Sequence, residues 1–202
     1  MQLAEWVRRE GIVLSEEFLR VDGFLNHRIA PAFIETAGGE IGGRFAPENV
    51  TLVLTAEAAG NVIAYEIARR LDARAVYAKK GRAATMSHPV VRCLRSPTKG
   101  VATEIAVSQD YLTSTERVLI VDDFLFRGTT SSALAEMTIE AGAALVGFAF
   151  IVEKGFAGGR EALSRFGVPI ESLLCVTRMD PATGAIEFAH ETPIVRAEVA
   201  DR

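Results

Sequence analysis

The sequence predicts an α/β fold built around a mainly parallel, five-stranded sheet that is flanked by helices. Five short runs are rich in Val, Ile and Leu and lack polar alternation, which is typical of strands that are covered on both faces. Helical patterns separate several of these runs, and alternation of strand and helix indicates βαβ units. The predicted strands are residues 50–55, 74–78, 117–121, 144–152 and 172–177.

Two helices are predicted between these strands from apolar residues spaced three and four positions apart. The first lies between strands 50–55 and 74–78, and its apolar face consists of Ala64, Ile67, Ala68 and Leu71. The second follows strand 117–121, and its matching positions are Leu134, Met137, Thr138 and Ala141. Gly142 stands where this second helix is expected to end.

Two regions depart from this alternation. Residues 1–45 are predicted to be mainly helical, with a second helix weakened by Gly38, Gly39, Gly42 and Gly43. Residues 81–116 are too long for an ordinary connection, and long connections in compact domains are often functional. We expect a flexible flap there, carrying an antiparallel ribbon of residues 90–95 and 103–108.

Composition and charge limit the partners that the chain can have. Its 202 residues suggest a single domain, residues 1–202. Lys and Arg number 22 against 26 Asp and Glu, without a basic block, so neither nucleic acid nor a membrane is an expected partner. No stretch is typical of a secretory signal or a membrane span. Cys93 and Cys175 suit neither a zinc motif nor a disulfide scaffold, and we expect a cytoplasmic protein.

The stretch "VLIVDDFLFRGTTSS" combines two acids with a loop rich in hydroxyls. A parallel sheet binds its ligand at the carboxyl ends of its strands, and Asp122 and Asp123 stand at that end of the third run. Gly128 permits a tight turn, and the first turn of the next helix leaves backbone N–H groups unpaired for a phosphate monoester. The carboxylates would repel a phosphate but accept hydrogen bonds from vicinal hydroxyls. Together they predict a ribose 5-phosphate site, although a metal site or a solvated strand end explains the acids alone.

The same string closely resembles the phosphoribosyl-pyrophosphate (PRPP) motif of the type I phosphoribosyltransferases. Segments 11–31, 105–112, 121–125 and 151–163 resemble the bacterial xanthine phosphoribosyltransferases in order and spacing. The resemblance implies the type I phosphoribosyltransferase fold, with a small hood over the site formed by residues 1–45 and 153–190. It also implies a homodimer that uses Mg²⁺, bound mainly through the diphosphate of the substrate, with no metal ligand assigned in the protein. The implied small-molecule partners are a purine base and PRPP.

By this resemblance, a large set of residues binds PRPP. The ribose hydroxyls are assigned to Asp122 and Asp123, which also stabilise the oxocarbenium-like sugar. The 5-phosphate is assigned to Phe126, Arg127, Gly128, Thr129 and Thr130. The diphosphate is assigned to Lys79, Lys80 and the loop Glu57, Ala58, Ala59 and Gly60. Lys79 and Lys80 are alternatively a solvated pair.

Two parts of this set depart from the family pattern. Ala58 and Ala59 replace residues with longer or hydroxylated side chains, which puts the affinity for diphosphate in doubt. Phe126 and Arg127 replace small residues before the glycine, and Phe126 could either cover the base or pack under the loop.

By the same resemblance, four residues are assigned to the base. Lys154 is both catalytic and base-binding, since an ammonium donates to a purine carbonyl and opposes negative charge on the base. Leu19, Asn26 and Phe124 are the other assigned contacts. The alternatives are a lysine that extends to solvent, a helix-capping asparagine and a core phenylalanine.

These observations predict a purine salvage phosphoribosyltransferase that transfers 5-phosphoribosyl to N9 of xanthine, giving XMP and diphosphate. Adenine or hypoxanthine/guanine specificity is an alternative, because a few contacts decide the base. A non-catalytic, PRPP-binding regulator is a second alternative, for which Ala58 and Ala59 leave room.

Overall fold

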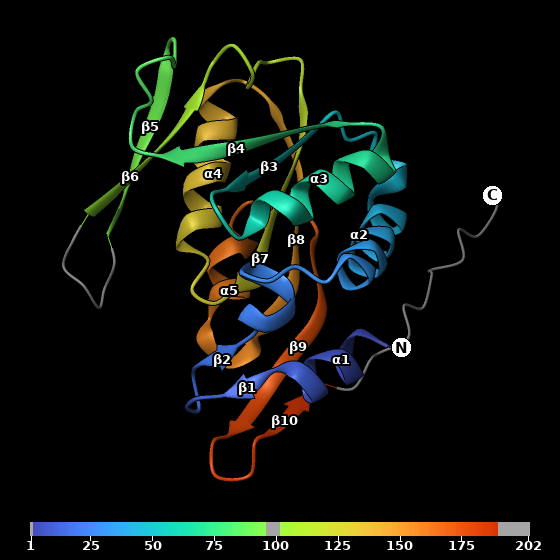
Figure 1. Cartoon of the computed structure of the whole chain (residues 1–202). Helices are drawn as coiled ribbons and strands as arrows, with labels where there is room; N and C mark the ends of the chain where they lie inside the picture. Colours follow the sequence, from blue (N-terminus) through green and yellow to red (C-terminus); the bar gives the residue numbers. More distant parts are fainter. Residues whose placement is uncertain (1, 96–101, 190–202) are drawn as a thin grey trace.

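The computed structural model of the chain describes residues 2–95 and 102–189 (Figure 1). The helices are α1 (Leu3–Glu10), α2 (Pro31–Phe45), α3 (Gly60–Leu71), α4 (Thr129–Glu140) and α5 (Gly159–Ser164). Short helical turns are η1 (Asp22–Asn26), η2 (Ala46–Glu48) and η3 (Gly155–Ala157). The strands are β1 (Ile12–Val13), β2 (Leu19–Arg20), β3 (Leu52–Ala56), β4 (Arg74–Lys80), β5 (Pro89–Arg95), β6 (Ala102–Ser108), β7 (Arg117–Leu125), β8 (Ala144–Lys154), β9 (Ile170–Asp180) and β10 (Ala185–Phe188).

The five predicted strands form the parallel centre of the sheet. Eight strands lie in the order β10-β9-β8-β7-β3-β4-β6-β5, and β9 through β4 in this order are mutually parallel. The predicted ribbon is confirmed as β5 and β6, which pair antiparallel, although residues 96–101 lie outside the described part of the chain. The ribbon also extends the main sheet, because β6 pairs with β4 at Lys79 and Lys80. At the opposite edge, β10 pairs antiparallel with β9 and was not among the predicted strands.

All five central strands end later than predicted, and this changes where the candidate residues lie. Asp122 and Asp123 are inside β7, because Phe124 still pairs with Val152 of β8. Lys154 is the last residue of β8 and pairs with Val176 of β9. Asp122 and Asp123 therefore lie a few residues before the end of their strand, since ladder hydrogen bonding continues past the apolar run, whereas Lys154 ends its strand as predicted.

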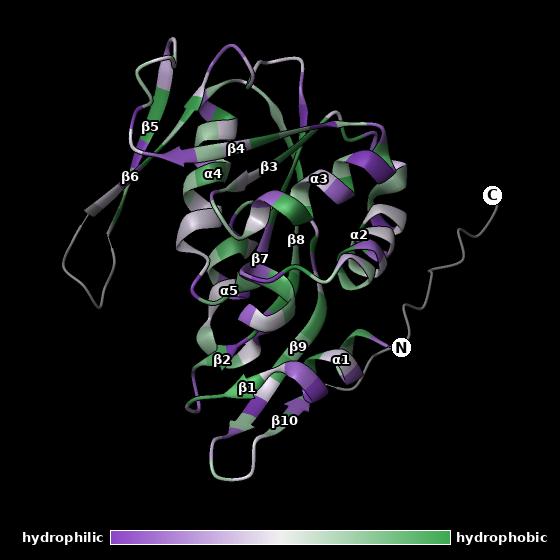
Figure 2. Cartoon of the chain, viewed as in Figure 1, coloured by the Kyte–Doolittle hydropathy of each residue, from purple (hydrophilic) through white to green (hydrophobic). Residues whose placement is uncertain are grey.

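The alternating side chains of the central strands form two separate cores. On one face, Val53 and Val121 pack with buried residues of α1, α2 and α3. On the other face, Leu54 and Ile120 pack with α4, α5 and the ribbon. Figure 1 shows the sheet between these helices, and Figure 2 shows hydrophobic colouring along the central strand β8. Each face buries apolar area that stabilises the fold by roughly 25 cal/mol per Å².

Helix α2 is continuous through its four glycines, so the expected weakening does not interrupt it. A Cβ atom at Gly38 would lie 2.4 Å from Cγ of Glu66, and one at Gly42 would lie 2.8 Å from Cβ of Arg70. These two glycines therefore allow α2 to approach α3 closely.

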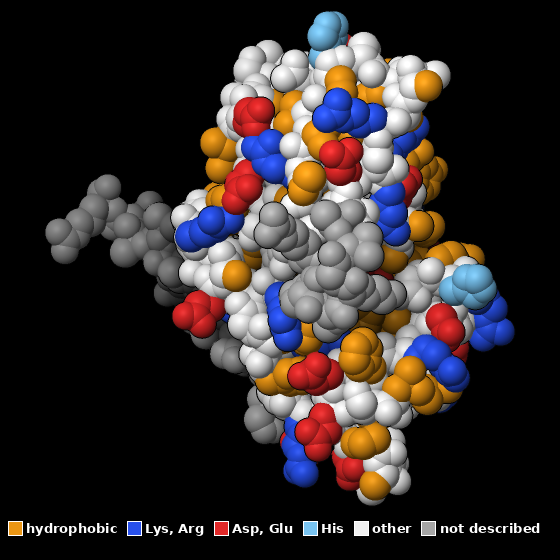
Figure 3. Space-filling model, turned by 90° about the vertical axis from the view of Figure 1, so that its left-hand side faces the viewer, with side chains coloured by type: hydrophobic (Ala, Val, Ile, Leu, Met, Phe, Trp, Pro, Cys, Tyr) orange, Lys and Arg blue, Asp and Glu red, His pale blue; other side chains and the backbone are white. Residues whose placement is uncertain are grey.

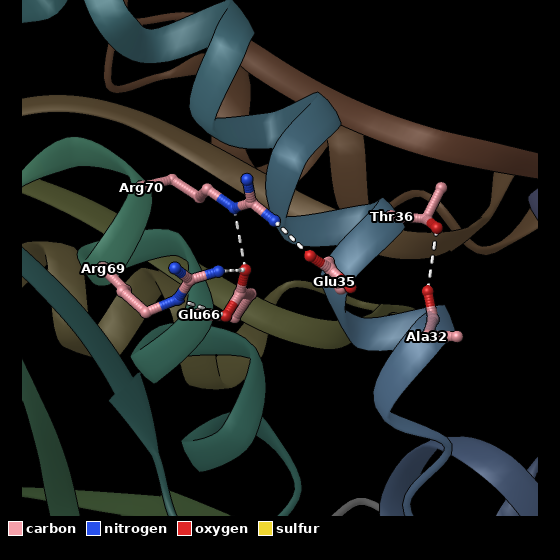
Figure 4. A network of polar contacts seen from close by, with 6 residues as sticks. All are labelled: Ala32, Glu35, Thr36, Glu66, Arg69 and Arg70. Carbon is pink, nitrogen blue, oxygen red and sulfur yellow. Dashed lines mark hydrogen bonds and ion pairs between the residues drawn. The ribbon is translucent and has the colours of Figure 1, made fainter.

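The side of α3 that faces α2 carries the network of Figure 4. Buried Glu66 accepts hydrogen bonds from Arg69 and Arg70, and Arg70 also contacts Glu35 of α2 at 3.1 Å. Hydrogen bonding from Arg69 holds the pKa of Glu66 below its usual range. The network therefore joins α2 to α3 through charged groups at the edge of the apolar contact.

The N-terminal segment and the C-terminal hairpin lie together at one end of the molecule. Helix α1 packs on β9 and β10, and the two-stranded sheet of β1 and β2 lies beside them (Figure 1). This end also holds η1, which brings Asn26 toward β7. Within the described residues, no helix is long and apolar enough to cross a membrane. On the described part of the face in Figure 3, basic and acidic side chains are interspersed.

Candidate active site

The paired acids of β7 are held by their own backbone. The N–H of Asp123 donates to Oδ1 of Asp122 at 2.9 Å, and the N–H of Phe124 donates to Oδ1 of Asp123 at 2.9 Å. Burial, and after it the neighbouring charge of Asp123, raises the pKa of Asp122 well above its usual range. The pair therefore resists carrying two negative charges until a donor or a cation approaches it.

The loop after β7 turns sharply into α4. Gly128 has φ +70°, a conformation that favours glycine, and α4 begins at the next residue. The first turn of α4 offers backbone N–H groups, and Thr129 and Thr130 add hydroxyls beside them. Arg127 is exposed at the same loop. This arrangement suits a phosphate monoester, as the sequence predicts.

Helix α5 supports this loop from behind, which sequence reasoning missed. A Cβ at Gly159 would lie 2.3 Å from the carbonyl oxygen of Phe126, and one at Gly128 would lie 3.1 Å from the oxygen of Gly159. The two segments therefore touch backbone to backbone. The paired glycines at 158–159 were the available signal, but their partner across the fold cannot be read from the chain.

Two cavities meet at the acids. One of ≈ 350 Å³ is lined by the loop after β7 together with Glu17, Phe18 and Phe124. The other, of ≈ 530 Å³, is lined by Asn26, the loop after β3, Lys80, part of the ribbon and both acids. Asp122 and Thr130 line both cavities. A ligand with a sugar at Asp122 can therefore extend in two directions.

The loop after β3 forms one wall of the larger cavity. Glu57, Ala58 and Ala59 line it, and the Glu57–Ala58 peptide is cis. Oε1 of Glu57 accepts a 2.6 Å hydrogen bond from the N–H of Lys80, which ties the loop to β4. Gly60 begins α3 against Thr55, where a Cβ would lie 1.8 Å from the threonine Oγ1. The loop thus has a fixed backbone but no side-chain hydroxyl of its own at Ala58 and Ala59.

The two lysines at the end of β4 do not lie together. Lys80 lines the cavity that contains the acids. Lys79 lines a different cavity of ≈ 640 Å³ with Tyr77 and Tyr111. Adjacent residues of a strand point to opposite faces, so only one of the pair can reach the acids from this chain.

Lys154 is almost fully enclosed, with 9% of its surface exposed. Its ammonium donates to the carbonyl oxygen of Glu17, and its Nζ lies 5.4 Å from the ring centre of Phe18 and 5.3 Å from that of Phe124. Burial lowers the pKa of Lys154, while the charges of Glu17 and Asp123 oppose this change. The lysine does not extend to solvent, so the snorkelling alternative is wrong.

The remaining base candidates are placed differently from one another. Asn26 donates from Nδ2 to Oδ2 of Asp123 at 2.9 Å, and α2 has no side-chain cap at its start, so the capping alternative is wrong. Phe124 is partly buried and lines the smaller cavity. Leu19 is 8% exposed and packs in the core that covers α1 to α3. The structure places Asn26 and Phe124 beside the acids. The contact of Leu19 with a base stays a prediction.

A buried ion pair beside Lys154 was also missed. Glu153 is 3% exposed, and Arg160 of α5 donates to both of its carboxylate oxygens at 2.9 and 2.6 Å. Burial opposes the charge, but hydrogen bonds from Arg160 and Ser172 outweigh it and leave the pKa of Glu153 below its usual range. The alternation of Glu153 and Lys154 in the strand was the signal, since one must face away from the site. The pair fixes the end of β8 to α5.

The acids do not form a metal cage by themselves. Within residues 2–95 and 102–189, no group of three His, Cys, Asp or Glu side chains is arranged to hold a metal ion. A hard cation such as Mg²⁺ needs about six oxygen ligands. Such an ion therefore fits this site only when a ligand supplies most of its oxygens.

Comparison with known sequences decides the family. A sequence model of the phosphoribosyl transferase domain matches residues 25–163. The chain belongs to the phosphoribosyltransferase family. It is 40% identical to the xanthine phosphoribosyltransferase of Heliobacterium modesticaldum over 188 residues, which cover 93% of this chain and 99% of that protein. It is 42% identical to the xanthine phosphoribosyltransferase of Chloroflexus aurantiacus over 178 residues, 87% of this chain and 83% of the relative.

Solved structures of the family confirm the predicted type I phosphoribosyltransferase fold. The adenine phosphoribosyltransferase of Giardia lamblia, solved with 9-deazaadenine, matches with a TM-score of 0.74 at 19% identity, covering 87% of this chain and 98% of that one. The enzyme of Rhodothermus marinus matches with a TM-score of 0.71 at 22% identity, covering 86% and 98%. At these identities the likeness concerns the fold, and the phosphoribosyltransferase sheet is the one described above.

Proposed function

We propose that this phosphoribosyltransferase transfers the 5-phosphoribosyl group of PRPP to N9 of xanthine, giving XMP and diphosphate. The observation that carries the proposal is the position of Lys154. Its ammonium lies 5.0–5.4 Å from the ring centres of Phe18, Phe124 and Phe126. These three rings line the small cavity together with Asp122 and the phosphate loop. The C1′–oxygen bond to diphosphate breaks, N9 bonds to C1′, and the N9 proton leaves to solvent. The similarity to xanthine phosphoribosyltransferases supports this choice of base.

The ribose lies at Asp122 and Asp123 in this proposal. Their carboxylates accept hydrogen bonds from the 2′- and 3′-hydroxyls and oppose positive charge that develops on the sugar ring. The raised pKa of Asp122 fits this role, because hydroxyl donors favour the ionised form that burial disfavours. The 5-phosphate then lies on the N–H groups and hydroxyls at Gly128 to Thr130, with Phe126 and Arg127 beside it.

Lys154 faces the base. An ammonium only donates, so it suits a purine carbonyl and opposes the amino group of adenine. Asn26 can both donate and accept, and its contact with Asp123 places it between base and sugar. Phe124 and Leu19 complete the proposed base contacts.

The diphosphate occupies the larger cavity in this proposal, against the loop of Glu57, Ala58, Ala59 and Gly60. Lys80 contributes charge directly, whereas Lys79 has no route to this cavity within one chain. Mg²⁺ would be held mainly by diphosphate oxygens, and when bound it neutralises charge on the leaving group. Leu94, Thr103 and Ile105 of the ribbon also line the cavity, which supports a role for 81–116 as a covering flap.

We further propose that 1–45 with 153–190 form the hood, that 1–202 act as one domain, and that the protein works as a cytoplasmic homodimer. The N-terminal segment reaches the acids through Asn26, which supports a hood role. The free thiols Cys93 and Cys175 fit a reducing compartment. Light scattering on the purified protein checks the dimer.

The test of the function is a radiolabelled-base assay with PRPP and Mg²⁺ across xanthine, hypoxanthine, guanine and adenine. Xanthine is expected to give the highest kcat/KM. Turnover of adenine alone would contradict the proposed role of Lys154. Tight PRPP binding without turnover of any base would instead favour the regulator that Ala58 and Ala59 leave open.

A further inference from the structure

The phosphate loop carries an aromatic side chain that its role does not require. Phe126 stands where the family pattern has a small residue, and its ring is partly buried. The space beneath the loop is already filled by Leu125 and Leu163, which are 1% and 0% exposed. A Cβ at Gly128 of the loop would lie 3.2 Å from Leu163, and a Cβ at Gly159 of α5 would lie 2.8 Å from Leu125. The ring of Phe126 is therefore not needed as support for the loop.

The ring of Phe126 instead faces the base-binding lysine. Nζ of Lys154 lies 5.0 Å from its centre, closer than to the rings of Phe18 and Phe124. The guanidinium carbon of Arg127 lies 5.3 Å from the same ring. Phe126 thus contacts the cation proposed for the base and the cation nearest the phosphate loop, and such cation–π contacts stabilise both charged groups.

The aromatic enclosure, Phe18, Phe124 and Phe126, leaves one ring largely uncovered. Phe18 is 62% exposed although it lies at the mouth of a cavity that also contains charged groups. Covering an exposed aromatic ring with a flat apolar surface removes apolar area from water, which favours binding of a flat ligand there. A purine base at Lys154 presents such a surface.

We propose that Phe126 is a base-positioning residue: its ring holds the ammonium of Lys154 toward the carbonyl edge of the base and packs on the base opposite Phe18. This inference rests on the proposed function, because it uses the same cavity and the same lysine. It goes beyond that function in assigning a residue of the phosphate loop to recognition of the base. The loop then contacts both ends of a nucleotide.

The test separates the base from the phosphate by comparing two ligands. Calorimetry measures Kd for XMP and for ribose 5-phosphate with the full chain and three variants. Phe126→Leu keeps apolar bulk but removes the ring, and Phe126→Tyr keeps the ring. Phe166→Leu is the control, because Phe166 also contacts an adjacent arginine, Arg165 at 4.6 Å, but lies outside the site.

Phe126→Leu is expected to raise Kd for XMP about 10-fold and Kd for ribose 5-phosphate less than about 2-fold. Phe126→Tyr and Phe166→Leu are expected to leave both constants within about 2-fold. Equal weakening of both ligands by Phe126→Leu would mean that the ring only supports the loop, and no weakening of either would mean that it contacts neither; both outcomes overturn the proposal. Wild-type protein that binds XMP but turns over no base would overturn the enzymatic function while leaving this comparison of ligands intact.

Discussion

The loops after β7 and β3 lie at the carboxyl ends of neighbouring strands, and both face the acids, yet they are built differently. The β7 loop carries hydroxyls, an arginine, an aromatic ring and a glycine with φ +70°. The β3 loop has alanines at its two central positions and is held to β4 by hydrogen bonds from the N–H of Lys80 to the carboxylate of Glu57 and from the N–H of Glu57 to the carbonyl of Ala78. One loop therefore offers side chains to its ligand, and the other offers mainly backbone.

The difference follows the chemistry of the two proposed phosphate groups. The 5-phosphate stays on the product, so its site contributes equally before and after reaction. In the proposed reaction the diphosphate must leave, and Mg²⁺ bound to it would supply positive charge. A loop with few side chains of its own binds such a leaving group without retaining it.

Removing both charges at the β7 end is expected to have the largest effect. Asp122→Asn with Asp123→Asn should lower kcat/KM about 10³-fold, because the developing charge on the sugar loses its stabilising groups. Steady-state kinetics with saturating PRPP measure the change. Circular dichroism checks that the double variant is folded, and a folded variant with near wild-type kcat/KM would contradict the assignment of the acids.

Adding one methyl group to either loop should separate their roles. Gly60→Ala places a Cβ 1.8 Å from Thr55 Oγ1. It should raise Kd for diphosphate about 10-fold and leave Kd for ribose 5-phosphate unchanged. Gly128→Ala strains a residue at φ +70° and should do the reverse. Calorimetry with each ligand measures both effects. Gly39→Ala is the control, since no atom lies within 4 Å of its added Cβ. Equal weakening of both ligands in both variants would contradict the division.

The burial of Asp122, together with the neighbouring charge of Asp123, should make the stability of the fold depend on pH. Burial raises the folded-state pKa of Asp122, so its destabilising contribution is absent below the ordinary value of about 3.9, grows as pH rises from there to the raised pKa, and is constant above it. Asp122→Asn should therefore raise Tm by about 2–4 °C at pH 7.5, and the gain should vanish as pH falls toward 3.9. Thermal melts across this range measure it. A gain that grows on acidification would reverse the sign and refute the argument.

The smallest effect is expected from restoring a hydroxyl to the β3 loop. Ala59→Ser adds a donor to the wall of the diphosphate cavity and should lower KM for PRPP about 3-fold, with kcat unchanged. Ala182→Ser, in the turn before β10, is a control of the same chemistry outside the site. An unchanged KM in Ala59→Ser would show that backbone contacts already saturate this site.

Much of the fold was predictable because its signals are local. Five uninterrupted apolar runs predicted strands that are buried on both faces, and all five strands lie in the parallel centre of the sheet. The motif at Asp122 to Thr130 joined acids, a glycine turn and a helix start in one continuous stretch. The sequence also allows the prediction that Lys79 and Lys80 point to opposite faces of the sheet, because side chains alternate along a strand.

Other features depend on neighbours that are distant in sequence. The glycines of α2 weaken an isolated helix, but Gly38 and Gly42 are favoured because Glu66 and Arg70 occupy the adjacent space. The contact of Gly159 with Phe126 has the same character. Strand ends were misplaced because pairing with a neighbouring strand continues into polar residues such as Asp122. Hydrophobic pattern reports burial, whereas hydrogen bonding decides where a strand stops.

The backbone amide of Lys80 lies where the β3 loop and the ribbon both contact β4. It donates to the β3 loop through Glu57, and the same residue pairs with Ile105 of the ribbon. Its hydrogen–deuterium exchange rate therefore reports how often this hydrogen bond opens, with no attached label. Slower exchange at this amide upon adding diphosphate would show that the ligand stabilises the contact between the β3 loop and β4.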